Sequence, residues 1–260
     1  METLRYENKK NRVAWKGVSL EDGDAFRDFM QNKVASRLRD EEGSDDFEAN
    51  LRSLAGTGFA TENLNNILNA EIPETRNWAT GEALAEAWLA KEHNIIWPWN
   101  MERDKRTPKA SLPGADLVGF ITENGQTQLV IGEVKTSSDS SSPPNVMYGR
   151  SGMTHQLDTI ATNLAILNQL LKWLWPRCKG SEFENIYKSA VTLLLNSGNN
   201  TVYLFGVLIR DVEPDENDLK SRGEYLSTKL QKPTNSLLIA LYLPCEISNL
   251  TTRITGGSST

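Results

Sequence analysis

The chain has 260 residues, of which 38% are hydrophobic and 24% charged, proportions that are ordinary for a globular protein. This length suits one large α/β domain, or a core domain with a smaller appended segment. The formal net charge of −6 argues against a protein that holds nucleic acid by bulk charge alone, because such binding depends on many contacts of Lys and Arg with phosphates.

Three features of the sequence predict a cytoplasmic protein without a membrane segment. No stretch approaches the ~18 uninterrupted apolar residues of a membrane span. The opening segment, METLRYENKKNR, lacks the apolar core of a secretory signal. The two cysteines, Cys178 and Cys245, are far apart and suggest neither a metal site nor a disulfide framework.

The N-terminal part of the chain is polar, with apolar residues at helix-compatible spacing between Phe26 and Leu38 and between Leu51 and Leu68. Gly56-Thr57-Gly58 separates short helices in the second stretch. We therefore expect a helical N-terminal region over residues 1–75.

Residues 76–250 have the pattern of an α/β core. A helix is expected from Thr80 as its N-cap, because GEALAEAWLAKEH is rich in good helix formers. Asn124-Gly125 lies between two apolar runs and predicts a tight β-hairpin. The remaining expectations are strands over 115–122, 127–135, 201–210 and 236–244, a long helix over 154–174 ended by Pro176, a helix over 182–195, and a disordered tail over 251–260.

This order of elements predicts an α/β fold with a mixed central β-sheet flanked by helices. The polar segment TSSDSSSPPN after the hairpin is either a plain connector or a mobile flap.

The hairpin gathers three charged residues at one end. Asp116 opens its first strand, while Glu133 and Lys135 close the second. The start of one antiparallel strand lies beside the end of the other, and residues two apart share a face. Two carboxylates and an amine would thus lie near one point, as metal-assisted phosphodiester hydrolysis requires. The two histidines, His93 and His155, have no obvious third partner and are expected to be structural or exposed.

The motif Gly-Ala-Asp116, hairpin, Gly-Glu133-Val134-Lys135 resembles the signature of the PD-(D/E)XK nucleases, the restriction-endonuclease-like superfamily. Asp116 matches the first acidic position and the tripeptide matches E-x-K. Pro113 is separated from Asp116 by two residues, whereas the motif proline is adjacent. The resemblance covers about residues 80–160 and implies a restriction-endonuclease-like core that uses Mg²⁺ or Mn²⁺.

RecB-like members of this superfamily often carry a Glu on the preceding helix and a Gln on the following one. Glu82 is similar to the first and Gln156 to the second, with Ile160 where an aromatic residue is common. Glu86, one turn beyond Glu82, is a rival for the same role. The resemblance implies catalytic roles for Asp116, Glu133, Lys135, Glu82 and Gln156, and metal contacts for Asp116, Glu133, Glu82 and Val134.

Nearby polar residues offer further contacts with phosphate. Arg106 and Lys109 precede the site, and Thr136 and Ser137 follow Lys135. Each is more simply explained as an ordinary loop or strand-end residue.

The segments GEALAEAW, SLPGADLVGF and LVIGEVKTSSD are also similar to nuclease subunits of bacterial anti-phage defence systems of the Hachiman type, which work with a helicase. This resemblance implies DNA as substrate and a helicase or ATPase as protein partner. Two alternatives stay open: a catalytically silent nuclease-fold module that binds nucleic acid or a protein, and a sequence-specific restriction enzyme.

Overall fold

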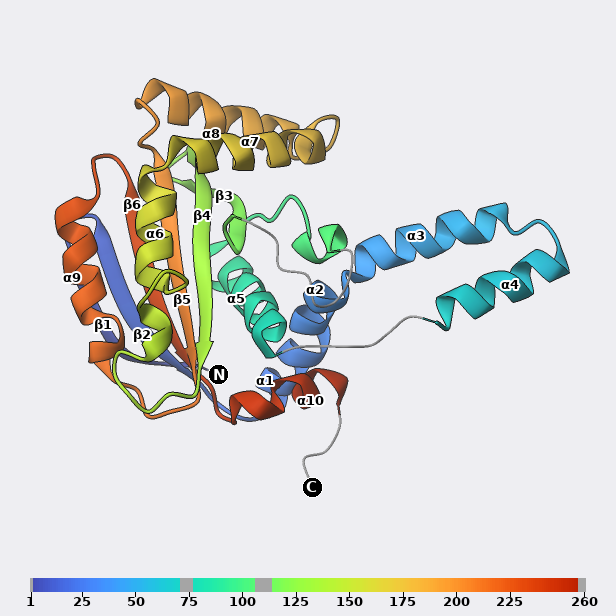
Figure 1. Cartoon of the computed structure of the whole chain (residues 1–260), viewed down its shortest axis with the longest axis horizontal. Helices are drawn as coiled ribbons and strands as arrows, with labels where there is room; N and C mark the ends of the chain where they lie inside the picture. Colours follow the sequence, from blue (N-terminus) through green and yellow to red (C-terminus); the bar gives the residue numbers. More distant parts are fainter. Residues whose placement is uncertain (1, 71–76, 106–113, 257–260) are drawn as a thin grey trace.

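A six-stranded mixed β-sheet runs through the centre of the protein (Figure 1). The structure is a computed structural model that describes residues 2–70, 77–105 and 114–256. The sheet order is β1-β2-β6-β5-β4-β3, in which the four inner strands are mutually parallel and the two edge strands are antiparallel to their neighbours. The strands are β1 Glu2–Lys10, β2 Val13–Leu20, β3 Leu117–Glu123, β4 Gln126–Ser137, β5 Val202–Arg210 and β6 Asn235–Tyr242.

The composition of each strand matches its place in the sheet. The central strands β5 and β6 are almost entirely apolar and buried, as parallel strands covered on both faces must be. The edge strand β1, ETLRYENKK, is mostly exposed and charged, which protects its free backbone groups from pairing with another chain.

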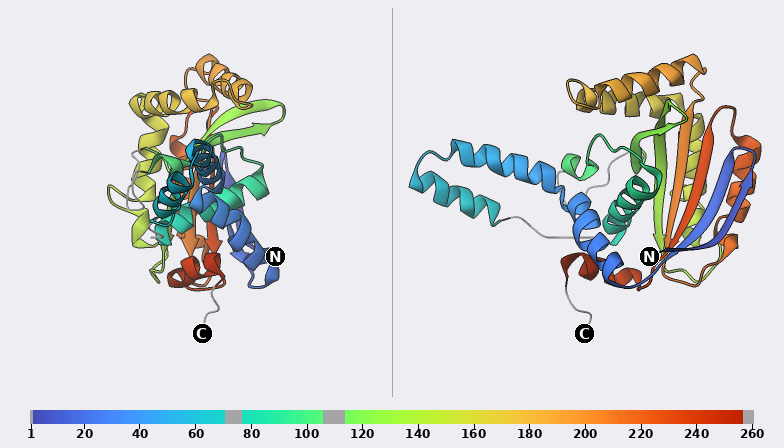
Figure 2. Two further views of the ribbon diagram at one scale, coloured as in Figure 1. Left: turned by 90° about the vertical axis from the view of Figure 1, so that its right-hand side faces the viewer. Right: turned by 180° about the vertical axis from the view of Figure 1, so that it is seen from behind.

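Helices cover both faces of the sheet (Figure 2). One core lies between the sheet and α5, the α1–α2 segment and α10, and it includes Leu84, Val134 and Ile239. The opposite face packs against α6, α7, α8 and α9. The expected α/β fold with a mixed sheet flanked by helices is therefore confirmed. The helices of these two layers are α1 Asp24–Asp28, α2 Ala35–Arg39, α5 Asn77–His93, α6 Met153–Thr162, α7 Leu164–Cys178, α8 Glu184–Asn196, α9 Lys220–Lys229 and α10 Leu250–Thr255.

Two further helices, α3 (Glu41–Leu54) and α4 (Gly58–Leu68), form a helical hairpin that projects from the body of the protein (Figure 1). We call residues 41–68 the arm. Thr57 caps α4 by accepting a hydrogen bond from the Ala60 N–H. No helix in the described part of the chain is long and apolar enough to cross a membrane.

The prediction that residues 1–75 are helical is wrong for the first twenty residues, which form β1 and β2. The two strands are joined at Asn11, whose φ of 55° lies in the left-handed region. β2 pairs in parallel with β6, more than 200 residues further along the chain, and this contact has no local signature. The helical prediction is confirmed between Asp24 and Leu68.

Several boundaries in the core also differ from prediction. The long helix is two helices, because Asn163 leaves the helical conformation and caps α7 by accepting a hydrogen bond from the Ala165 N–H. α7 continues past Pro176 to Cys178. The helix expected to begin at Thr80 begins at Asn77.

Two other segments contain helices that were not expected. The connection between β5 and β6 contains α9 (Lys220–Lys229). The tail predicted to be disordered from residue 251 is helical through Thr255 as part of α10, since Leu250 and Ile254 pack into the core. Residues 257–260 lie outside the described residues.

Candidate functional site

The hairpin forms as its turn sequence predicts. Asn124 and Gly125 have φ values of 50° and 75°, the positive pair that a two-residue type I′ turn needs. The register pairs Leu117 with Gly132, and continuing it by one residue places Asp116 opposite Glu133. Side chains of opposite residues point to the same face of a sheet. The fold therefore brings Asp116 and Glu133 together, as the sequence predicts.

β4 is longer than its hairpin partner, and this leaves an open edge. Pairing with β3 stops at Gly132, whereas pairing with β5 continues to Ser137. The Asp116 carboxylate occupies part of this edge, where Oδ2 accepts a hydrogen bond of 2.9 Å from the Val134 N–H. The N–H and C=O of a residue in an extended strand point the same way. The Val134 carbonyl therefore faces the open edge, while its side chain packs in the core.

Glu133 is a buried carboxyl group with one oxygen unpartnered. Its side chain is 1% exposed, and Oε1 accepts a hydrogen bond of 2.6 Å from Lys135 Nζ. Oε2 has no hydrogen-bond partner among the described residues. Burial, and then repulsion by Asp116, raise the pKa of Glu133 to about 8, although Lys135 opposes this shift. Two carboxyl groups, those of Asp116 and Glu133, therefore share one lysine at this end of the hairpin.

Glu82 approaches the same place from α5. A Cβ added to the preceding residue, Gly81, would lie 2.3 Å from Thr136 Oγ1, so only glycine allows α5 to lie this close to β4. Burial, and then repulsion by Asp116, raise the pKa of Glu82 to about 8. Lys105 Nζ, 3.6 Å from Glu82 Oε2, opposes the shift. Asp116 is thus a charged neighbour of both Glu82 and Glu133.

Glu86, the rival of Glu82, belongs to a different network. It accepts a hydrogen bond of 2.7 Å from Arg37 Nε, and this arginine opposes the rise in the Glu86 pKa that burial causes. The Glu86 backbone carbonyl accepts a hydrogen bond from the Trp97 indole. Glu86 therefore joins α5 to α2, and the structure favours Glu82 as the acid beside Asp116.

Lys105 is a residue that the sequence did not single out. Its side chain is only 6% exposed, and it pairs with both Glu82 and Glu102. Its ammonium group lies 4.6 Å from the centre of the Trp78 ring, an arrangement typical of a cation–π contact. Arg106 and Lys109, the two candidate phosphate contacts in the segment RDKRTPK, lie outside the described residues.

Gln156 lies on the face of α6 that turns toward the sheet. Met153 and Leu157, three residues before and one after, contact Gly206 of β5, which is paired with Glu133. The side-chain oxygen Oε1 of Gln156 is buried and has no hydrogen-bond partner in the described part of the chain. No hydrogen bond joins Gln156 to Lys135 among the described residues, so the structure places Gln156 on the correct face without a direct link.

The remaining candidate residues either have structural contacts or are exposed to solvent. Ser137 Oγ accepts a hydrogen bond from the Asp139 N–H, while Thr136 packs against Gly81. His93 lies 3.2 Å from Lys16 Nζ, and burial, followed by that positive charge, lowers its pKa to about 4. His155 is exposed. Both histidines match the expectation that they are structural or exposed.

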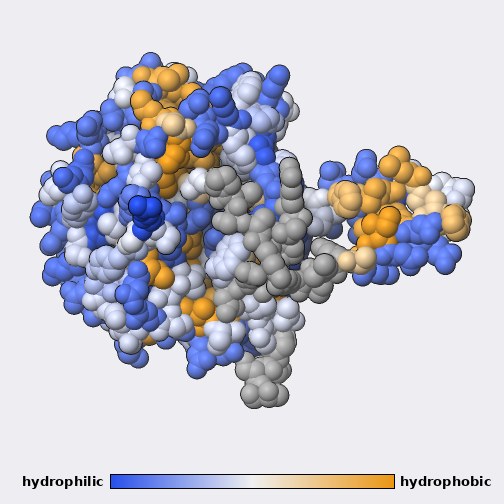
Figure 3. All heavy atoms as spheres, in the orientation of Figure 1, coloured by the Kyte–Doolittle hydropathy of each residue, from blue (hydrophilic) through white to orange (hydrophobic). Residues whose placement is uncertain are grey.

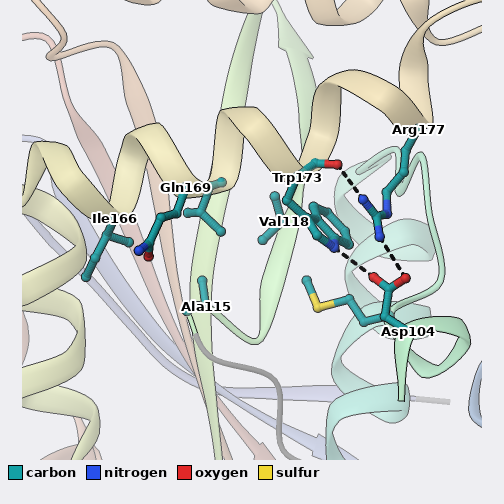
Figure 4. Close-up of a pocket in the computed structure, with 10 residues that line it drawn as sticks. Asp104, Ala115, Val118, Ile166, Gln169, Trp173 and Arg177 are labelled. Atoms are coloured by element: carbon teal, nitrogen blue, oxygen red, sulfur yellow. Dashed lines mark hydrogen bonds and ion pairs between the residues drawn. The ribbon is translucent and has the colours of Figure 1, made fainter. Parts of the chain in front are cut away.

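A cavity of about 320 Å³ lies beside the hairpin, between β3 and α7 (Figure 4). Asp104 forms one wall and accepts hydrogen bonds of 2.7 Å from the Trp173 indole and from Arg177. Val118, in the lining, pairs with Ile131, two residues before Glu133. Alternate residues of a strand share a face and are spaced about 7 Å apart. The cavity is therefore next to the carboxylates on the same face of the sheet.

The donor set fits a hard divalent cation. Mg²⁺ is usually held by one or two carboxylates, with water and phosphate oxygens completing an octahedron. Glu133 Oε2 is unpartnered, and Asp116 and the Val134 carbonyl share the same edge. A cation there would offset the burial and the repulsion by Asp116 that together raise the pKa values of Glu82 and Glu133. Within residues 2–70, 77–105 and 114–256, no group of three or more His, Cys, Asp or Glu side chains lies close enough together to hold a metal ion.

The chain matches no protein-family model and no curated protein.

Proposed function

We propose that this protein is a Mg²⁺- or Mn²⁺-dependent nuclease that hydrolyses DNA phosphodiester bonds at Asp116, Glu133 and Lys135. The observation that carries the proposal is Glu133: a buried carboxyl group between an acid and a lysine at the open end of a hairpin, with one oxygen that no described residue hydrogen-bonds. Such strongly perturbed carboxylates in a recess are typical of functional sites.

The residues of the site have distinct tasks in this proposal. A bound divalent ion would polarise the phosphoryl group and lower the pKa of a water nucleophile. Asp116 is held in position by the Val134 N–H, and Glu133 by Lys135. The Lys135 ammonium, 20% exposed, can stabilise negative charge that develops on the phosphate. Glu82 supplies a third acid from the helix side, and Lys105 restrains it.

The cavity between β3 and α7 offers room for the part of the substrate next to the phosphate. Its lining combines the apolar side chains of Val118 and Leu170 with the Trp173 ring and the Gln169 amide. Aromatic and apolar surfaces of this kind bind bases by stacking, with little dependence on sequence. This supports a nuclease that acts on an unpaired or frayed strand.

A cleavage assay tests the proposal. Linear and supercoiled DNA are incubated with the wild type and with Lys135→Ala, in Mg²⁺ or in EDTA. Lys188→Ala is the matched control, because Lys188 forms a similar Lys–Glu pair with Glu184 on the far helix α8. We expect Mg²⁺-dependent cleavage by the wild type and by Lys188→Ala, and loss of cleavage by Lys135→Ala. Equal cleavage by both variants would contradict the proposed site.

Two further outcomes separate the alternatives. Discrete fragments from a plasmid would identify a sequence-specific restriction enzyme, whereas a smear would identify nonspecific degradation. Calorimetry that detects no binding of Mg²⁺ or Mn²⁺ would favour a catalytically silent nuclease-fold module. A role in anti-phage defence beside a helicase or ATPase, and a cytoplasmic location, stay proposals that rest on the sequence resemblance and composition.

A further inference from the structure

The arm, residues 41–68, displays apolar side chains that the body of the protein does not cover. α3 contains no buried residue, and α4 contains only Leu64. Phe47, Leu54, Phe59 and Ile67 are 55%, 73%, 76% and 64% exposed. Figure 3 shows hydrophobic surface along the arm, interspersed with hydrophilic surface. A concentration of large exposed apolar residues on one projecting element is a mark of an interaction site.

The apolar residues of α3 form a stripe with an acidic border. Phe47, Leu51 and Leu54 are spaced by four and three residues, so they share one helix face. Each residue turns the helix by 100°, which places Asp46 and Glu48 on the two flanks of this stripe. A partner must therefore offer apolar surface at the centre and positive charge at the rim.

The arm carries nearly all of the protein's net charge. Its acids are five residues of α3 and Glu62 of α4, against Arg52 as its one basic residue, so its net charge is −5. The whole chain has 34 acidic and 28 basic residues. Without the arm, 28 acidic and 27 basic residues remain, a net charge of −1. The negative balance is therefore a local property of the arm.

This charge excludes two kinds of occupant. Nucleic acid would be repelled, since its phosphates require positive charge. A symmetric contact between the arms of two copies would place one acidic arm against another, and like charges across an interface are unfavourable. A protein surface bordered by Lys and Arg meets both requirements of the arm. α3 and α4 supply 14 and 11 residues, the size of one side of a standard interface, roughly 20–30 residues.

The base of the arm is fixed to the body next to the proposed site. Arg103 donates two hydrogen bonds of 2.7 Å to the Asp40 carboxylate at the start of α3. A Cβ on Gly43 would lie 2.3 Å from Arg103 Nε, so this glycine allows the pair to form. The residues that follow Arg103 are Asp104, in the cavity wall, and Lys105, beside Glu82. A partner bound to the arm would therefore lie one ion pair away from residues 103–105, the segment that borders the site.

We propose that the arm is a docking element for a protein partner that presents an apolar groove bordered by Lys and Arg. The proposal rests on the exposure and charge of the arm and does not depend on nuclease activity.

The test uses the full chain and two fluorescent helical peptides as probes, one with a leucine stripe bordered by lysines and the other with the same stripe bordered by glutamates. Fluorescence anisotropy measures their binding. We expect the wild type to prefer the Leu/Lys peptide. Phe47→Ser/Leu54→Ser should weaken this binding by at least about tenfold, and Asp46→Lys/Glu48→Lys should reverse the preference toward the Leu/Glu peptide.

Leu195→Ser is the matched control, because Leu195 is 62% exposed on α8 in the body, and it should leave binding unchanged. Circular dichroism confirms that each variant is folded, which is expected since the replaced side chains are exposed. Equal binding of both peptides, or equal weakening by Leu195→Ser, would overturn the proposal. A wild-type dimer in sedimentation velocity that is lost in Phe47→Ser/Leu54→Ser would assign the arm to a second copy and likewise overturn it.

Discussion

Replacing Glu133 by Gln tests the charge balance of the proposed site through stability rather than activity. Glu133 is 1% exposed, and burial together with Asp116 raises its pKa from 4.5 to about 8. The unfolded chain keeps the lower value, so folding favours the protonated form. The stabilisation from this group is therefore complete below about pH 4.5 and is lost as the pH rises through 8.

The structure sets the size of this effect. A pKa raised from 4.5 to about 8 corresponds to roughly 5 kcal/mol of unfolding free energy. Gln has the same shape and does not titrate, so Glu133→Gln removes this pH dependence and gives up the pairing with Lys135. We expect the variant to resemble the wild type near pH 5 and to be several kcal/mol more stable than the wild type at pH 8.5.

Urea unfolding followed by circular dichroism, at pH 5 and pH 8.5 in EDTA, measures this difference. Glu62→Gln, an exposed position on the arm, is the control and should follow the wild type at both pH values. Saturating Mg²⁺ should restore wild-type stability at pH 8.5 with little effect on Glu133→Gln, because a ligand stabilises only the folded state that binds it. Parallel pH profiles for the wild type and Glu133→Gln would refute the reasoning.

Other substitutions probe the geometry of the site. Lys135→Ala should lower the rate of Mg²⁺-dependent cleavage by about 10²–10³-fold while leaving the circular dichroism spectrum unchanged; a smaller loss would remove Lys135 from the reaction. Gly81→Ala should destabilise the protein by about 1–3 kcal/mol, because the added Cβ meets Thr136 Oγ1 at 2.3 Å, and Thr136→Ala in the same chain should restore much of the loss in a thermal melt. Gly119→Ala should destabilise by a similar amount, since its Cβ would lie 2.5 Å from the Ile96 carbonyl; an unchanged melting temperature would show that this packing relaxes freely.

Local sequence patterns were sufficient to predict the β-hairpin and the charged residues at its end. Asn124-Gly125 specifies a turn with two positive φ values, and a turn of known length determines the register of its strands. The meeting of Asp116 with Glu133 follows from that register alone. The pairing of Glu133 with Lys135 follows from the two-residue period of a strand.

Contacts between residues far apart in the sequence determine the features that the sequence patterns did not predict. β1 is polar because it lies at the edge of the sheet, so its sequence lacks the apolar alternation of a strand. Asn163 interrupts a leucine pattern that continues across α6 and α7, because its side chain caps the second helix. The sequence left open whether Glu82 or Glu86 is the acid beside Asp116. The fold answers this question, because it places Arg37 beside Glu86.

The sequence by itself determined the local geometry of the site: a hairpin, two carboxylates and a lysine, each set by a turn and a two-residue period. Only the tertiary structure decided what surrounds them. It placed Lys105 against Glu82, buried Glu133 and left one of its oxygens unpartnered. It also concentrated the negative charge on a projecting arm whose apolar residues remain exposed. Burial and the pairing of charges depend on which distant segments pack together, and no local pattern specifies that packing.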